Sequence, residues 1–223
     1  MKVGALVSGA KDSMYAAYAA SKKHELVCLI TLIPENPDSY MFHVPNLHLV
    51  SKQAELIGLP LVSIPTSGEK ETELDDLKEA IQIAKDKYKI EAVVSGAIAS
   101  EYQKSRVDRI CRELKLESIA PIWHMNAEQY MQKLVLEGFE AIIVQVAAEG
   151  FDESWLGRNI DRNAIADLKK LNVHIAGEGG EYESFVLDCP MFRKKITIVS
   201  AEKKMESEYA GVYKIEEIKL AGK

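Results

Sequence analysis

The chain has 223 residues, 47% of them hydrophobic, and its 28 basic and 34 acidic side chains leave a formal net charge of −6. This length allows one large or two modest domains, and the negative charge argues against general nucleic-acid binding. Three cysteines, Cys28, Cys111 and Cys189, form no CxxC pair, so neither a zinc site nor a disulfide framework is predicted.

The first half of the chain alternates between patterns typical of strands and of amphipathic helices. Strands are expected at 3–7, 26–33, 61–64, 91–95 and 118–123, and helices at 14–23, 46–57, 73–88 and 102–116. Polar loops are expected at 34–44 and 66–70. Strands separated by helices of this length predict an α/β fold with a parallel sheet and right-handed crossovers.

The second half has a different pattern. A helix is expected at 126–138, a strand at 141–147, a second helix at 163–171 and further strands at 185–187, 195–200 and 212–220. The last two segments alternate between apolar and polar residues, which is typical of antiparallel strands. We therefore predict two domains with a soft boundary near 123–126: residues 1–124, and a smaller α+β domain over 125–223.

The turn from Ser8 to Ser13 is the first candidate site. An apolar strand runs into small residues, and these open a helix, which places backbone N–H groups, a helix N-terminus and Lys11 around one point. The two serines offer hydroxyl groups, and Asp12 is a candidate to hold Mg²⁺ or to shape the loop. The spacings of the dinucleotide fingerprint and of the Walker loop are both absent. The alternative is a tight turn in which Ser and Asp cap the helix.

Ala10 raises a question about the geometry of this turn. If its position requires a positive φ, a Cβ atom there costs about 1–2 kcal/mol. A right-handed conformation at Ala10 would remove that cost.

A second patch, Gly96–Arg106, follows a later strand and is expected at the same sheet edge. Gly96 and Ala97 would let backbone approach a ligand, and Arg106 has the geometry to brace a phosphate. Polar side chains crowd the start of the next helix: Ser100, Tyr102 and Gln103. The alternative is a helix N-terminal turn with a solvated arginine.

Two further segments combine glycine, acidic and aromatic residues. Residues 177–188 carry Glu178, Glu181 and Glu183 around glycines, and the last two share a face if both enter a strand. Such carboxylates can hold a cation, bind ammonium or accept a proton; the alternative is an exposed acidic hairpin turn. Residues 152–158 place Trp155 among charges of both signs, and the alternative there is a tryptophan used in packing.

The motifs together carry a family resemblance. Ser8–Ser13 is similar to the SGGxDS loop of the ATP pyrophosphatase (PP-loop) superfamily, with Ala10 as the departure. Over nearly its full length the chain resembles the diphthine–ammonia ligase, or diphthamide synthase, family. The matching stretches are VSGAKDS, SYMFHVPN, GAIASEYQKSRVDRICRELKLESIAPIW, DESWLGR and GEGGEYESFVLDCP. The resemblance implies a Rossmann-like PP-loop domain followed by a substrate-binding domain.

The resemblance also implies a reaction: ATP-dependent amidation of diphthine on translation elongation factor 2 with ammonia, through an acyl-adenylate, releasing AMP and pyrophosphate. It assigns Ser8, Gly9, Ala10, Lys11, Asp12 and Ser13 to pyrophosphate and Mg²⁺, with Asp12 as the metal ligand. It adds Gly96 and Ala97 to the nucleotide site, and it places Tyr40, Met41 and His43 against the adenosine or in a lid over the site.

The remaining assignments concern the acyl substrate. Ser100, Tyr102, Gln103 and Arg106 would line its site, and Lys11, Asp12, Glu178, Glu181 and Glu183 are the catalytic candidates. Diphthine carries a trimethylammonium group, which acidic and aromatic side chains can receive. We expect Glu181, Glu183 and Trp155 or Tyr182, with Gly179 and Gly180 beside them, to hold this cation.

The expected partners are elongation factor 2 and free ammonium, with no membrane and no direct nucleic-acid binding, and a homo-oligomer is compatible with the sequence. The N-terminus lacks a signal-peptide pattern, so a cytoplasmic location is expected. Two other functions use a similar loop: a PP-loop tRNA-modifying enzyme of the thiolation or lysidine type, and a non-catalytic ATP- or AMP-binding module.

Overall fold

The computed structural model describes residues 1–34, 45–67 and 72–223. The chain divides into two compact units. The first comprises Met1–Ser8 and Asp12–Trp123, and the second comprises Gly9–Lys11 and His124–Lys223. The second unit thus includes three residues of the N-terminal turn. Each unit is described separately below, and the assignment of 1–124 and 125–223 as functional domains stays a prediction.

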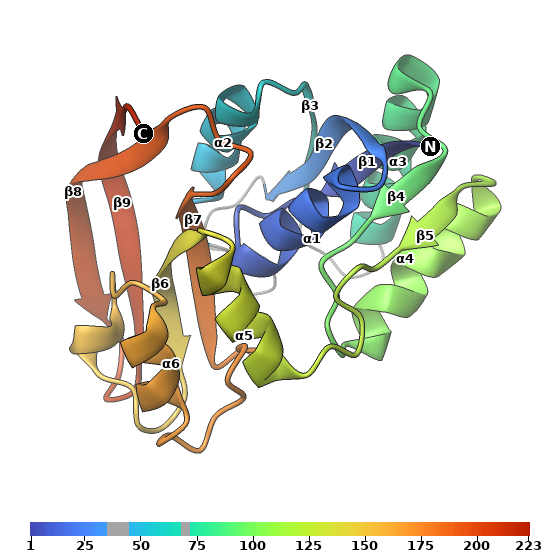
Figure 1. Cartoon of the computed structure of the whole chain (residues 1–223). Coiled ribbons are helices and arrows are strands. Elements are labelled where there is room, and N and C mark those ends of the chain that lie inside the picture. The colour runs from blue at the N-terminus through green and yellow to red at the C-terminus, as the bar shows by residue number, and fades with distance from the viewer. Residues whose placement is uncertain (35–44, 68–71) are drawn as a thin grey trace. The chain divides into compact units, whose positions relative to one another are not determined.

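The first unit is built on a parallel sheet of five strands, β1 (Lys2–Leu6), β2 (Glu25–Pro34), β3 (Leu61–Thr66), β4 (Ala92–Val94) and β5 (Glu117–Ile119). Its helical segments are α1 (Lys11–Ser21), η1 (Leu47–Leu49), α2 (Val50–Ile57), α3 (Thr72–Tyr88) and α4 (Glu101–Glu113). The strand order is β3-β2-β1-β4-β5, the Rossmann order, in which the sequential order of the parallel strands reverses between β1 and β4 (Figure 1). This confirms the predicted Rossmann-like α/β fold.

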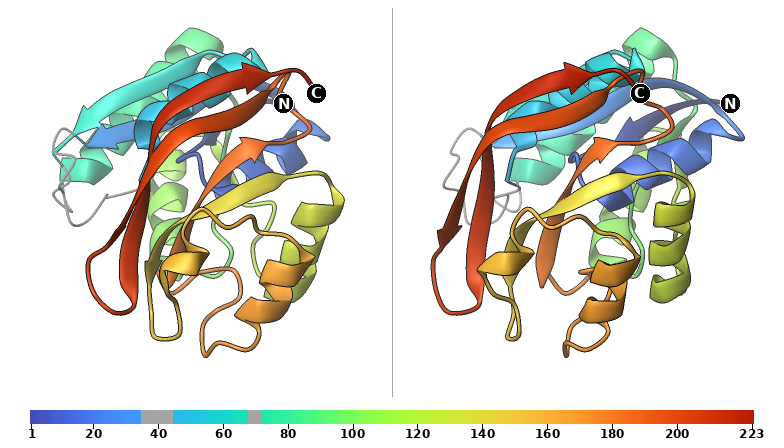
Figure 2. Two further views of the ribbon diagram at one scale, coloured as in Figure 1. Left: turned by 90° about the vertical axis from the view of Figure 1, so that its left-hand side faces the viewer. Right: turned by 60° about the vertical axis from the view of Figure 1, so that its left-hand side comes forward.

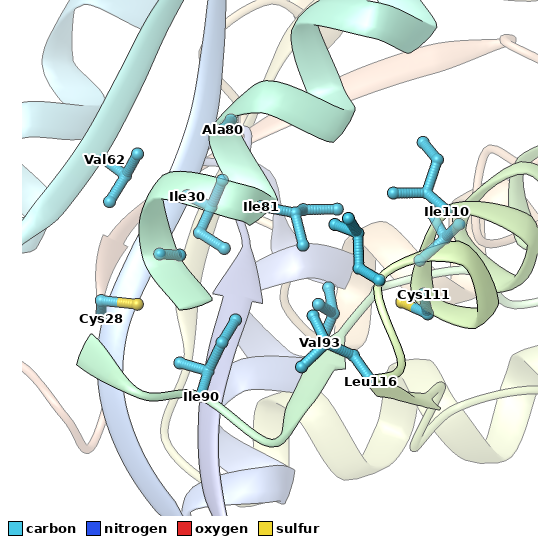
Figure 3. Close-up of a cluster of buried hydrophobic side chains, with 13 residues drawn as sticks. Cys28, Ile30, Val62, Ala80, Ile81, Ile90, Val93, Ile110, Cys111 and Leu116 are labelled. Carbon is cyan, nitrogen blue, oxygen red and sulfur yellow. The ribbon is translucent and has the colours of Figure 1, made fainter. Parts of the chain in front are cut away.

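Apolar runs in these strands form the core of the unit. Ile30 on β2, Ile81 on α3 and Val93 on β4 belong to one cluster of buried side chains, which α4 extends through Ile110 (Figure 3). Leu29 and Ile30 are neighbours in sequence and both fully buried, so the sheet is covered on both faces.

Two of the cysteines lie in this cluster, as Figure 3 shows. Burial raises the pKa of the Cys28 thiol to about 12 and that of Cys111 to about 11. Cys189, in the second unit, is also buried, and its pKa is raised to about 12 for the same reason. All three thiols are therefore protonated at neutral pH.

The second unit is an antiparallel sheet with short helices, as predicted. Its elements are α5 (Ala127–Leu136), β6 (Glu140–Ala147), η2 (Glu153–Trp155), α6 (Arg162–Leu168), β7 (Tyr182–Asp188), β8 (Lys195–Met205) and β9 (Ala210–Ala221). The strand order is β7-β6-β9-β8. Strands β8 and β9 form a long hairpin that leaves β8 at the edge of the sheet (Figure 2).

Element ends differ from the sequence predictions for local reasons. The strand predicted to reach residue 123 ends at Ile119, and Pro121, which cannot donate to a ladder, lies in the following turn. The helix predicted from residue 46 begins as a 3₁₀ turn after Asn46, whose φ is 69°. No helix in the described part of the chain is long and apolar enough to cross a membrane.

Candidate active site

The turn between β1 and α1 places its one left-handed residue at Gly9, where φ is 82°. Among the described residues only Asn46, Lys89, Lys115 and His124 combine a side chain with a positive φ. Ala10 is not among them, so its Cβ atom causes no left-handed strain. The departure from the usual glycine at this position therefore leaves the turn geometry intact.

Within the first unit, Ser8 and Ser13 close the turn against each other. The Ser8 backbone N–H donates to the Ser13 Oγ over 3.2 Å, and the two hydroxyl oxygens lie 3.3 Å apart. Both hydroxyl groups thus lie at the N-terminal end of α1, where the helix dipole favours an anion.

Position 96 requires glycine because the main chain of the first turn packs directly against it, which the sequence context did not indicate. A Cβ atom there would lie 2.6 Å from the backbone N of Ser13 and 2.7 Å from the backbone C of Asp12. The prediction that Gly96 lies near the first turn is therefore met through backbone packing. Ala97 follows it and is buried.

Within the second unit, residues 9–11 are bonded to β7. The Val186 N–H donates to the Gly9 carbonyl over 3.0 Å. The Lys11 N–H donates to the Oγ of Ser184 over 3.1 Å, and Ser184 is buried. No role for Ser184 was predicted from the sequence. The available signal was its position two residues after Tyr182 in an apolar strand, which places a polar side chain on the same buried face.

The Lys11 side chain is buried in the same unit. Its ammonium donates to the Ala176 carbonyl over 2.7 Å and lies 5.1 Å from the centre of the Tyr182 ring. The lysine predicted to meet pyrophosphate is thus held by the glycine-rich segment 177–188 and the residue before it. The sequence motifs did not predict this contact, because its acceptor is a main-chain carbonyl.

The glutamates of 177–188 do not share a strand face. Strand β7 begins at Tyr182, so Glu183 lies in the strand and Glu181 precedes it. The Glu181 carboxylate instead accepts the backbone N–H groups of His174 and Gly179, each over 2.8 Å. The condition of that expectation, that both glutamates enter a strand, is therefore not met, because β7 begins one residue after Glu181.

The other members of this segment lie in or beside the same turn. The Glu178 N–H donates to the Nδ1 of His174 over 3.3 Å, and Gly180 donates to the Gly177 carbonyl over 3.2 Å. The Tyr182 hydroxyl donates to the Ile175 carbonyl over 2.8 Å, and its ring is buried. The segment is thus an ordered turn with its own network of hydrogen bonds.

Trp155 is buried and packs edge-to-face on Phe151, which contacts the Tyr182 ring in turn. Arg158 lies over the Trp155 ring and pairs with Asp167. The segments 152–158 and 177–188 are therefore joined by one aromatic cluster. Trp155 therefore packs within the unit, which was the predicted alternative to a role in substrate binding.

The start of α4 holds the remaining polar candidates. Ser100 is the N-cap, and its Oγ accepts the Gln103 N–H over 3.3 Å. Tyr102 is 54% exposed, and the Arg106 guanidinium lies 3.2 Å from the centre of its ring. Tyr102 and Gln103 are thus exposed on the first turn of α4, where a solute can reach them.

Glu73, on the first turn of α3, is a titratable group that the sequence motifs missed. Burial raises its pKa to about 7, although the Arg106 charge acts in the opposite direction. The half-buried carboxyl therefore titrates near neutral pH.

Not every candidate can be placed. Tyr40, Met41 and His43 lie outside the described residues. Within residues 1–34, 45–67 and 72–223, no three His, Cys, Asp or Glu side chains group as a metal site. A single carboxylate such as Asp12 suits Mg²⁺, which is held by one or two carboxylates together with phosphate oxygens.

A parallel sheet of order 3-2-1-4-5, with a glycine turn and a helix N-terminus beside the switch point, defines a Rossmann-like α/β protein of the nucleotide-binding type. Residues 1–118 match the model of the diphthamide synthase N-terminal domain, and 126–221 that of the C-terminal domain. The chain belongs to the diphthamide synthase family.

Curated relatives agree with the domain models. A mouse protein named diphthine–ammonia ligase is 37% identical over 93% of this chain and 86% of its own length. A bovine protein of that name is 38% identical over 91% and 84%. A budding-yeast protein of that name is 33% identical, and the match spans 34% of its length.

One solved structure is described as a predicted subunit of tRNA methyltransferase from Methanocaldococcus jannaschii. It is 18% identical and covers 85% of this chain and 98% of its own, with a TM-score of 0.47.

Proposed function

We propose that this chain is a ligase that amidates diphthine on translation elongation factor 2 with ammonia, using ATP and releasing AMP and pyrophosphate. One observation carries the proposal: relatives named diphthine–ammonia ligase align with more than nine-tenths of this chain at 37–38% identity. The turn at the switch point, in which serine hydroxyls meet a helix N-terminus, supports a phosphate-binding step.

The proposed reaction has two steps. The diphthine carboxylate attacks the α-phosphorus of ATP, the bond to the β-phosphate oxygen breaks, and pyrophosphate leaves an acyl-adenylate behind. Ammonia then attacks the acyl carbon, AMP departs with the electrons of the broken C–O bond, and one proton leaves the nitrogen. Both steps develop negative charge on phosphate oxygens, so donors placed at those oxygens lower the barrier.

The chain offers these donors at the first turn. We assign the hydroxyls of Ser8 and Ser13 and the N–H groups at the start of α1 to pyrophosphate. The Lys11 ammonium has three N–H donors, so it can keep its bond to the Ala176 carbonyl and donate to a phosphate oxygen as well. We assign Asp12 to Mg²⁺, whose charge would offset that of the phosphates.

The acyl substrate is assigned to other residues. Tyr102, Gln103 and Arg106 line the exposed start of α4, and we propose Glu178 and Glu183 for the trimethylammonium group or ammonium. Reception of that cation on the rings of Trp155 or Tyr182 would need the aromatic cluster to open, because both rings are buried. The translation factor as substrate is the reason to propose a cytoplasmic location.

The test is direct. The protein is incubated with ATP, Mg²⁺, ammonium and diphthine-bearing elongation factor 2, while AMP release and the mass of the modified histidine peptide are followed. We expect AMP and amide in equal amounts, with both lost when either ammonium or the factor is omitted and strongly reduced in Lys11→Ala. AMP formed without ammonium and without the factor would rule out the ligase.

The same assay separates the other two functions. A nucleotide-binding module would bind ATP and form no AMP, and a tRNA-modifying enzyme would form AMP only when tRNA replaces the elongation factor.

A further inference from the structure

The turn before β7 is held closed by the side chain of Glu181. One carboxylate oxygen accepts the His174 N–H and the other accepts the Gly179 N–H, each over 2.8 Å. The Glu181 carbonyl accepts the Ala147 N–H of β6 over 2.8 Å, which anchors the residue to the sheet. The carboxylate therefore joins both ends of the segment 174–179.

That segment carries the acceptor for Lys11. The Ala176 carbonyl, in the middle of the closed segment, accepts the Lys11 ammonium over 2.7 Å. The adjacent Ile175 carbonyl accepts the Tyr182 hydroxyl, and the Tyr182 ring lies 5.1 Å from the same ammonium. All these residues belong to the second unit. The direction of the Ala176 carbonyl, and with it the place of the lysine charge, thus depends on a turn that Glu181 closes.

Gly179 fits tightly against this carboxylate. A Cβ atom there would lie 2.8 Å from Oε1 of Glu181 and 3.0 Å from Oε2. A side chain at position 179 would therefore push the carboxylate out of the turn while leaving its charge in the protein. This supplies a second way to open the turn.

We infer that Glu181 is a positioning residue for Lys11, in place of the direct contact with substrate expected from the sequence. Its carboxylate keeps the segment 174–179 in the form that holds the lysine beside the phosphate turn. Both oxygens accept backbone N–H groups, which fits a structural clip better than capture of ammonium or trimethylammonium. The inference rests on the proposed function only in taking the Ser8–Ser13 turn as the nucleotide phosphate site.

The decisive variant is Glu181→Gln, because a glutamine has one oxygen and one NH₂ group. The NH₂ group would face a backbone N–H, so one of the two bonds is lost. Binding of ATP with Mg²⁺ is measured by calorimetry in the absence of elongation factor, and the KM for ATP, ammonium and the factor is measured in the amidation assay. Glu202→Gln, at an exposed site on β8, is the matched control.

We expect Glu181→Gln to weaken ATP binding and raise the KM for ATP about tenfold, with the KM for ammonium and for the factor unchanged. In a Lys11→Ala background the same substitution should have no further effect on ATP binding, because its effect passes through the lysine. Glu202→Gln should bind ATP as the wild type does. Thermal unfolding shows whether each variant is folded.

Other outcomes would overturn the inference. A rise in the KM for ammonium or the factor, with ATP binding unchanged, would make Glu181 a substrate contact. Additive effects of Glu181→Gln and Lys11→Ala on the free energy of ATP binding would show that the two residues act independently. Should Glu181→Gln not fold, Gly179→Ala takes its place, and failure of both to fold would show a general structural role instead.

The binding measurement keeps this inference distinct from the proposed reaction. If the wild type binds ATP but forms no amide, the proposed function fails while the Glu181 comparison still stands. If the wild type does not bind ATP, both fail.

Discussion

Each residue of the first turn has its own structural role, and the sequence pattern alone does not distinguish these roles. Gly9 has the positive φ, Ser8 and Ser13 bond to each other, and Lys11 donates to Ala176. Ala10 contributes a buried methyl group. The residue that departs from the family loop therefore lies at a position where the backbone accepts a side chain.

Ala10→Gly should lower stability slightly. The substitution removes no left-handed strain, since φ at Ala10 is not positive, and it adds conformational freedom to the unfolded chain. We expect a loss of about 0.5–1 kcal/mol in the free energy of unfolding, measured by urea denaturation. A more stable variant would show that Ala10 is strained after all.

Gly96→Ala should be more damaging. Its Cβ atom would meet main-chain atoms of Asp12 and Ser13 at 2.6–2.8 Å, and backbone cannot move aside as a side chain can. We expect a loss of about 1–3 kcal/mol together with weaker ATP binding, measured by thermal unfolding and calorimetry. Gly222→Ala, which has no neighbour within 4 Å, is the control. Equal melting temperatures for the two variants would contradict the close approach.

At the scale of elements, helix ends account for residues that look like ligands in the sequence. Ser100 caps α4, and Asp152 caps η2 through the Ser154 N–H. The Ser154 hydroxyl, together with that N–H, holds the pKa of Asp152 below its usual range. Ser and Asp before a helix favour either a cap or a ligand site. The hydrogen bonds show the cap.

Replacing Ser100 separates the two roles. Ser100→Ala should lower stability by about 1 kcal/mol because the Gln103 N–H loses its acceptor, whereas Ser100→Asp should retain the cap. Urea denaturation measures both variants. If Ser100→Ala reduces amidation while stability is unchanged, Ser100 is a substrate contact and the cap is unimportant.

Helix α3 begins with a carboxyl group that titrates near neutral pH. Glu73 has its pKa raised to about 7 by burial, which outweighs the charge of Arg106, and Asp76 adds to the increase. Below pH 4.5 the group is protonated in both states. As the pH rises from 4.5 to 7 only the unfolded chain ionises it, so stability falls through this window and then levels off.

Glu73→Gln should remove this dependence. The variant stays neutral at every pH, so its stability relative to the wild type should increase between pH 5 and pH 8. Urea denaturation at the two values measures the change, with Glu79→Gln, exposed on the same helix, as the control. A constant difference between variant and wild type would show that Glu73 ionises normally in the folded protein.

At the scale of the whole molecule, the N-terminal turn contributes to both compact units. Residues 9–11 bond to β7 and to the Ala176 carbonyl, while Ser8 and Asp12 belong to the unit of the parallel sheet. The second unit is therefore not a continuous stretch of sequence. We expect the stability of the second unit to depend on these three residues of the N-terminal turn.

A fragment of residues 124–223 tests this dependence. It lacks Gly9–Lys11, so the Ser184 hydroxyl and the Val186 N–H lose their partners. We expect it to unfold at lower urea concentration than the second unit in the full chain, as followed by the fluorescence of Trp155, its only tryptophan. Trp123→Phe in the full chain isolates the same signal, and equal midpoints would mean that residues 9–11 are dispensable.

Most of the secondary structure was predictable from the sequence, because it depends on the pattern of apolar and polar residues within short segments. Continuous apolar runs such as 26–33 indicate buried parallel strands, and the alternation in 195–200 indicates an antiparallel one. The strand–turn–helix at Ser8–Ser13 is likewise recognisable from residue types, and its use as a phosphate site stays a prediction. Boundaries were less accurate where Pro121 or Asn46 interrupts an element.

The sequence by itself determined the fold class, the strand–turn–helix at Ser8–Ser13 and the family, since each follows from short-range periodicity or from motifs in order along the chain. Only the tertiary structure decided that Gly96 packs on backbone, that Glu181 closes a turn and that Lys11 binds Ala176. Those contacts join residues as many as 165 positions apart. Several use main-chain donors and acceptors, which every residue has and no motif distinguishes.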